Sequence, residues 1–149
     1  MKHISLRKTF VIKAPVTEVF KIITDFENIP KNFPKVAKSI TITKRDGDYL
    51  EADVVVKSFG TIFPVKMKTQ IIPQKGFVSD NDSPKFGTSG HEEFLLEEFE
   101  GGTKIKYLYE LDIHKKWLRI IAKPFLKCFV MKIWEKAVLD EIKKMLENK

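Results

Sequence analysis

The chain has 149 residues, 43% of them hydrophobic and 32% charged, which is typical of one globular domain with a sizeable core and excludes a disordered or fibrous protein. Its single cysteine, Cys128, excludes an internal disulfide framework, and its three scattered histidines offer no metal-ligand spacing, so we expect no metal or other cofactor and a reducing, cytoplasmic environment. The net charge is +7; because lysines are spread through every segment, we interpret it as a source of solubility, with attraction to nucleic acid or an anionic membrane as the alternative.

Residues 3–13 alternate between apolar and polar side chains, which predicts a half-buried strand, with Lys8 on its apolar face. Pro15 suits the first turn of a helix, and apolar residues then follow helical spacing. Pro30 and Pro34 interrupt this helix and leave room for one more short helical turn.

From Val36 onward the pattern is typical of consecutive strands, with a tight hairpin turn at Asp46-Gly47-Asp48. The strand that contains Pro64 fits an edge or a bulge, because proline cannot donate to a strand ladder. Gly101-Gly102 turns the chain into the most regular alternation of the sequence. We expect one strand around Ile40 and Ile42, followed by strands at 49–59, 61–72, 77–82, 91–100 and 103–113.

The last segment has helical periodicity, and it carries too many lysines and arginines, together with Pro124, to span a membrane. We expect a short helical piece at 117–122 and then a main helix that begins near Pro124 and ends at about Leu146. Its apolar side chains share one face of a helical wheel: Val130, Met131, Trp134, Ala137, Val138, Ile142 and Met145.

Burial determines how these elements combine. Consecutive antiparallel strands with short turns form one meandering sheet, whose single apolar face must be covered, and the terminal helix is the element long enough to cover it. We therefore expect one α+β domain over residues 1–149, in the order strand, two helices, six strands and helix, with about seven strands in a curved antiparallel sheet around the long C-terminal helix.

Several local patterns resemble the helix-grip superfamily often called SRPBCC, which includes StAR-related lipid-transfer domains, aromatic polyketide cyclases and coenzyme Q-binding proteins. The resemblance rests on the element order and on the turn segments 12–15, 19–20, 24–30 and 100–103. The stretch Phe33-Pro-Lys-Val-Ala-Lys-Ser39 is most similar to the coenzyme Q-binding branch, while the remainder fits polyketide cyclase/dehydrase-like members equally well. The resemblance implies a deep hydrophobic cavity between sheet and helix, and no catalytic motif of the family transfers residue by residue.

Large side chains that can line an apolar ligand site occupy the predicted inward faces. Aromatic and methionine side chains line such pockets well, and a tyrosine hydroxyl can orient a ligand through a hydrogen bond, although the same residues can also fill a solid core. The candidates are Phe10, Phe63, Met67, Phe94, Tyr107, Tyr109, Met131 and Trp134. Lys8 and Lys127 fall on apolar faces too; each either meets a polar ligand group or extends to solvent, and we favour solvent.

No catalytic set emerges from the sequence. His91-Glu92-Glu93 supplies an acid and a base, but neighbouring strand residues point to opposite faces, so His91 and Glu92 cannot converge.

The segment Lys115–Lys132 interleaves basic with large apolar residues and could dock on an anionic membrane through Trp117, Phe125 and Phe129, or pack against Phe26 and Phe33, which we favour. Nothing beyond net charge favours nucleic-acid binding.

The leading functional hypothesis is binding or transport of a hydrophobic small molecule such as a lipid, an isoprenoid quinone or a polyketide. The main alternative is a cyclase or dehydratase that acts on a polyketide-like or aromatic substrate in the same cavity, through an inward tyrosine, histidine or acid. A third hypothesis is a protein that acts at membrane or RNA surfaces through its positive charge.

Overall fold

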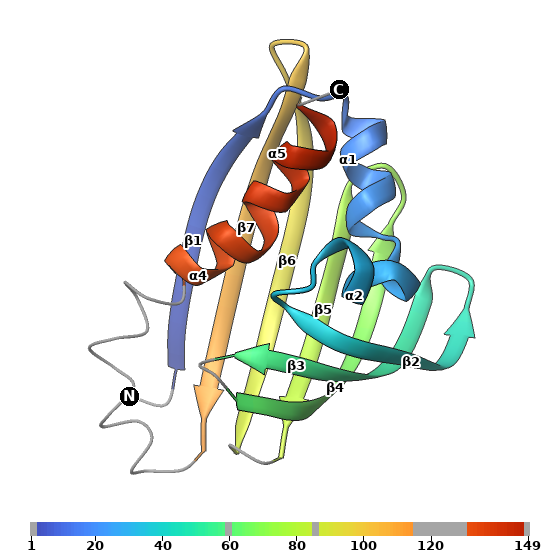
Figure 1. Ribbon diagram of the computed structural model, residues 1–149, viewed down its shortest axis with the longest axis vertical. Helices are drawn as coiled ribbons and strands as arrows, with labels where there is room; N and C mark the ends of the chain where they lie inside the picture. The colour runs from blue at the N-terminus through green and yellow to red at the C-terminus, as the bar shows by residue number, and fades with distance from the viewer. Residues whose placement is uncertain (1–2, 59–60, 85–86, 115–130, 148–149) are drawn as a thin grey trace.

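The computed structural model describes residues 3–58, 61–84, 87–114 and 131–147. Seven strands form one antiparallel sheet in the order β1-β7-β6-β5-β4-β3-β2 (Figure 1). Strands β1 and β2 are therefore its two edges. The strands are β1 (His3–Ile12), β2 (Ala37–Asp46), β3 (Tyr49–Ser58), β4 (Thr61–Ile72), β5 (Gly76–Ser83), β6 (Thr88–Phe99) and β7 (Gly102–Ile113).

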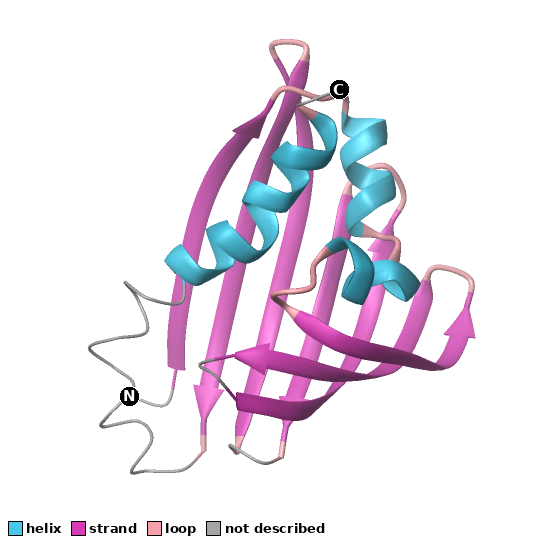
Figure 2. Ribbon diagram, viewed as in Figure 1, coloured by secondary structure: helices cyan, strands magenta, loops and turns pink. Residues whose placement is uncertain are grey.

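The helices lie on one face of the sheet (Figure 2). Between β1 and β2 come α1 (Val16–Ile23), the 3-10 turn η1 (Phe26–Asn28) and α2 (Ile29–Asn32). The C-terminal helix consists of α4 (Met131–Trp134), the π-helical turn η3 (Glu135–Leu139) and α5 (Asp140–Leu146). It runs diagonally across β1 and β7, and α1 contacts α5, β6 and β7.

Local chemistry explains the turns and edges. Gly47 has φ +59° in the two-residue link between β2 and β3, a conformation that glycine adopts without steric cost. Pro64 lies in the part of β4 that extends beyond its pairing with β5, which starts at Lys66, so its missing N–H leaves no gap in that ladder. Register shifts in β2, at Ala37/Ser39 and Ile42/Lys44, bend the edge strand.

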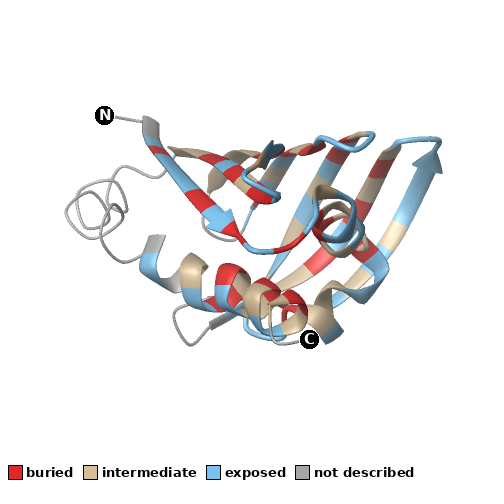
Figure 3. Cartoon of the chain, turned by 90° about the horizontal axis from the view of Figure 1, so that it is seen from above, coloured by how far each residue is buried: buried red, intermediate tan, exposed pale blue. Residues whose placement is uncertain are grey.

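Strand alternation divides the sheet into an inner face, which the helices cover, and an outer face. Figure 3 shows the buried segments of the strands above the buried side of the C-terminal helix. The core between them includes Ile12, Leu50, Ile105 and Ile142, each 0% exposed. Among the described residues, no helix combines the length and the apolar character that a membrane crossing needs.

The predicted α+β helix-grip architecture is confirmed, including the element order, the antiparallel sheet and the helix end at Leu146. Two details differ: β6 begins at Thr88, before the expected start at His91, and a π-helical turn interrupts the terminal helix. The predicted short helix at 117–122 and the predicted helix start at Pro124 lie outside the described residues.

Candidate functional site

An aromatic cluster joins the C-terminal helix to the inner face of the sheet. The ring of Trp134 lies 4.0 Å from that of Tyr107, 5.2 Å from that of Phe10 and 5.8 Å from that of Phe94, measured between centroids. Phe94 also stacks on Phe77 at 5.6 Å. Phe10, Phe94 and Tyr107 are buried and Trp134 is half-buried, so the cluster holds helix and sheet together.

Four of the residues predicted to contact a ligand, Phe10, Phe94, Tyr107 and Trp134, therefore come together in this cluster. Tyr109 lies two residues further along β7 on the same face, half-buried. Phe63 and Met67 lie on β4, away from the strands that carry the aromatic cluster, and both are half-buried. The remaining candidates fall outside what the structure describes: Lys127, Trp117, Phe125, Phe129 and the side chain of Met131.

The inner face also carries a carboxyl group, that of Glu92, which was not among the predicted ligand-binding residues. Glu92 lies two residues before the inward-facing Phe94 on β6, and its half-buried side chain accepts a hydrogen bond from the hydroxyl of Tyr107. Burial raises the pKa of Glu92, outweighing the hydrogen bond from Tyr107 and the attraction of His91, which both lower it. Burial, with the negative charge of Glu92, also raises the pKa of Tyr107 far above its ordinary value.

Glu92 belongs to a polar row that crosses four neighbouring strands at one level of the inner face. Tyr109 pairs with Glu92, Glu92 with Ser79, and Ser79 with Thr69. The hydroxyl oxygens of Thr69 and Ser79 lie 2.9 Å apart, and Ser79 also donates to Asn81 Oδ1 at 3.3 Å. Thr69 and Ser79 are buried, and their mutual hydrogen bond compensates for the loss of water.

Gly90 explains how the ring of Tyr109 fits against the neighbouring strand β6. A Cβ at Gly90 would lie 3.1 Å from Tyr109 Oη, so glycine accommodates the phenol ring. The hydroxyl of Tyr109 has no hydrogen-bond partner among the described residues. Burial, with the charge of Glu92, raises the pKa of Tyr109 to about 12, so its hydroxyl keeps its proton and acts as a donor.

Lys8 forms an ion pair with Glu135, on the first residue of the π-helical turn. Its side chain is 47% exposed, and its ammonium lies 5.5 Å from the centre of the Phe10 ring. Lys8 is thus the cross-strand neighbour of Tyr107 and is bound to the helix.

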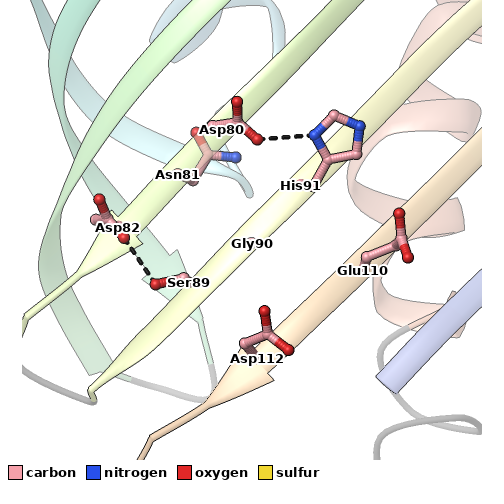
Figure 4. A pocket seen from close by; sticks show the side chains of 8 residues that line it. All are labelled: Asp80, Asn81, Asp82, Ser89, Gly90, His91, Glu110 and Asp112. Carbon is pink, nitrogen blue, oxygen red and sulfur yellow. Dashed lines mark hydrogen bonds and ion pairs between the residues drawn. The ribbon is translucent and has the colours of Figure 1, made fainter. Parts of the chain in front are cut away.

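The outer face carries a different cluster, centred on His91. The residues labelled in Figure 4 line an open depression of about 290 Å³. His91 Nδ1 lies 2.7 Å from Asp80 Oδ1, and Nε2 lies 2.8 Å from Glu93 Oε2. Both carboxylates raise the pKa of His91, which favours the imidazolium form. His91 and Glu92 lie on opposite faces of the sheet, as alternation predicts, so His91 does not face the inner side. The described residues contain no group of ligands suited to a metal ion.

Chemically, the inner face therefore offers an apolar wall with one proton donor in Tyr109 and one carboxyl group in Glu92. Because burial raises its pKa, Glu92 holds its proton to higher pH than an exposed carboxyl does, and its oxygens can also accept a hydrogen bond.

Comparison with solved structures shows that the fold is shared at low sequence identity. The di-domain ARO/CYC protein of the steffimycin biosynthetic pathway matches with a TM-score of 0.83 at 15% identity, over 98% of this chain and 51% of that chain. This chain thus spans about half the length of that di-domain protein. The aromatase/cyclase Zhui from Streptomyces sp. R1128 matches with a TM-score of 0.76 at 15% identity, over 98% of this chain and 94% of the other.

A norcoclaurine synthase from Thalictrum flavum, solved with a transition-state analogue, matches with a TM-score of 0.70 at 12% identity, over 98% of this chain and 95% of that chain. A comparison with the curated proteins found no matching sequence. The model of the family described as polyketide cyclase / dehydrase and lipid transport matches residues 3–148. The chain therefore belongs to the polyketide cyclase / dehydrase and lipid transport family.

Proposed function

We propose that this protein binds or carries a hydrophobic small molecule between the inner face of its sheet and its C-terminal helix. The observation that carries the proposal is the polar row at Glu92 and Tyr109, set into an otherwise apolar wall with a donor that no described residue uses. Membership of a family of cyclases, dehydrases and lipid-transport proteins supports the same conclusion.

The apolar part of the proposed site lies on β3 and β4. The inward side chains of Val56, Val65 and Met67 are half-buried, whereas those nearer the aromatic cluster, such as Ile71, are buried. Apolar side chains that the protein itself covers only in part are suited to cover by an apolar ligand.

Two experiments test the binding proposal. Organic extraction and mass spectrometry of the purified protein should recover an apolar compound, and the neutral fluorophore N-phenyl-1-naphthylamine should bind with increased emission. Met67→Trp fills the inner face and should weaken fluorophore binding at least tenfold. Lys66→Trp, one residue earlier and exposed on the outer face, is the matched control and should leave it unchanged. Absence of fluorophore binding, or equal effects of the two substitutions, would contradict the proposal.

A second candidate function is catalysis of cyclisation or dehydration of a polyketide-like or aromatic substrate in the same place. The observation that favours it is the raised pKa of Glu92 beside Tyr107, because such a carboxyl can protonate a carbonyl or a leaving hydroxyl. Glu92→Gln should then lower turnover about 10²–10⁴-fold while fluorophore binding persists. A variant with full turnover removes Glu92 from this role.

Transient contact with an anionic membrane through Trp117, Phe125 and Phe129 remains a separate proposal. Sedimentation with anionic vesicles at two salt concentrations tests it, because electrostatic attachment weakens as salt rises. Vesicle binding that does not depend on salt, or no binding, would count against it.

A further inference from the structure

The hydrogen-bonding groups at the polar row are only partly used. Tyr107 donates its single proton to Glu92, whereas the Tyr109 hydroxyl has no partner among the described residues. A carboxyl group has two oxygens, so Glu92 keeps capacity for a further hydrogen bond beside the one from Tyr107. The Tyr109 hydroxyl and one oxygen of Glu92 therefore lie on directly paired residues of β7 and β6, on the inner face of the sheet.

The phenol ring of Tyr109 lies over Gly90. Gly90 is the inward position on β6 two residues before Glu92, and its partner on β5 is Asn81. Because a Cβ at Gly90 would approach Tyr109 Oη to 3.1 Å, any larger residue would crowd the hydroxyl. Glycine at position 90 thus lets the phenol group of Tyr109 lie against β6 with its hydroxyl beside the Glu92 level of the sheet.

The charged groups around Glu92 and Tyr109 do not favour the binding of an anionic ligand. Glu92 is itself acidic, and Lys8, the cross-strand neighbour of Tyr107, is already paired with Glu135. A ligand carboxylate placed against Tyr109 would lie beside Glu92 and would lose water without gaining a cation from the described residues. A ketone or phenol oxygen carries no such cost and can use the same groups.

We propose that Glu92, Tyr107 and Tyr109 form the polar end of the ligand site and that they select a ligand with a neutral oxygen, an aryl ketone or a phenol, over the matching carboxylate. The inference rests on the proposed function and names its ligand class. Tyr109 donates to a ketone oxygen, and Glu92 accepts from a phenol. Tyr107 acts as a positioning residue, because its hydroxyl orients the carboxyl group of Glu92.

The test uses three ligands that share one ring system: 2-acetylnaphthalene, 2-naphthoate and 2-ethylnaphthalene, titrated by their fluorescence at pH 8.5. Tyr109→Phe should weaken binding of 2-acetylnaphthalene about fivefold, which corresponds to one neutral hydrogen bond, and change that of 2-ethylnaphthalene by less than about twofold. Glu92→Gln should tighten binding of 2-naphthoate at least about fivefold, because it removes the neighbouring negative charge.

Glu93→Gln, one residue along on the outer face, is the matched control and should change no affinity. Binding of 2-ethylnaphthalene also shows that each variant keeps an intact apolar site. If the wild type binds the hydrocarbon but the two substitutions change neither the ketone nor the carboxylate affinity, the selection mechanism is wrong and the binding function stands. If the wild type binds none of the three, both the function and the mechanism are wrong.

Discussion

Truncation of Trp134 tests whether the C-terminal helix is held by packing or only borders a ligand space. The Trp134 ring is the helix side chain that reaches three rings of the sheet, with centroids at 4.0 Å, 5.2 Å and 5.8 Å. Trp134→Ala removes all three contacts at once. If packing holds the helix, the loss appears as lower stability whether or not a ligand is present.

The expected magnitude follows from burial. Removal of a large buried aromatic side chain costs about 3–5 kcal/mol, and because Trp134 is only half-buried we expect about 2–4 kcal/mol. For a chain of this size, 1 kcal/mol corresponds to a change in Tm of about 2–4 °C, so Tm should fall by roughly 5–15 °C. Trp134→Phe keeps a ring and should lose about half as much.

Thermal and urea unfolding, followed by circular dichroism of ligand-free protein, measure the effect. Lys136→Ala, exposed on the same helix, is the control and should stay within about 0.5 kcal/mol of the wild type. A loss below about 1 kcal/mol for Trp134→Ala, with weaker binding of an apolar fluorophore, would refute the packing interpretation and assign Trp134 to the wall of a ligand cavity.

Three further predictions concern ionisation and backbone space. The folded-state pKa of Glu92 is raised above its ordinary 4.5, so the wild type should lose more stability than Glu92→Gln as pH rises from 4.5 through that folded pKa. The folded-state pKa of His91 is raised above 6.5, so its stabilising effect is complete below pH 6.5 and disappears as pH rises through the folded value; His91→Gln should be less stable only on the acid side. Gly76→Ala should destabilise by about 3 kcal/mol or more, because Gly76 has φ +127° and a Cβ there would lie 1.9 Å from the Phe94 carbonyl oxygen.

Urea unfolding at pH 4.5, 6 and 8.5 checks the first two predictions, and thermal unfolding checks the third. Identical pH profiles for wild type and Glu92→Gln would show that this carboxyl titrates as it does in the unfolded chain. For His91→Gln, a deficit that grows toward high pH would reverse the assigned sign. Gly101→Ala is the control for Gly76, since Gly101 has φ +79° but open space around a Cβ, and should cost only about 1–2 kcal/mol.

The fold could be predicted from the sequence because it follows from short-range patterns. Alternation and turn residues determine seven strands, and burial requires a helix over the apolar face. The π-helical turn could not be predicted, because its hydrogen-bond pattern leaves no periodic signal of its own. Its wider turn shifts the buried stripe by about one residue, so Leu139 and Leu146, absent from the predicted face, are buried at 4% and 8% exposure.

The candidate site was predictable only in its apolar part. Aromatic residues on inward positions could be counted from alternation, and Phe10, Phe94, Tyr107 and Trp134 do meet. Glu92 was missed although extension of the same alternation back from Phe94 places it inward. A strand carboxylate is normally exposed, and its burial here depends on how β6 pairs with β7, which local sequence does not encode.

The polar row is costly for a protein that needs only a packed core. Residues on four strands, Tyr109, Glu92, Ser79 and Thr69, interrupt apolar alternation at one level of the sheet, although they are far apart in the chain. Apolar side chains at these positions would avoid burying a carboxyl group and leaving the Tyr109 hydroxyl without a partner among the described residues. Ser79 and Thr69 satisfy each other, so that half of the row is explained by structure alone. The Glu92–Tyr109 half is not explained in this way. A tyrosine hydroxyl without a partner among the described residues, next to a carboxyl group whose charged form is disfavoured by burial, is the kind of local inconsistency that a binding or catalytic role accounts for.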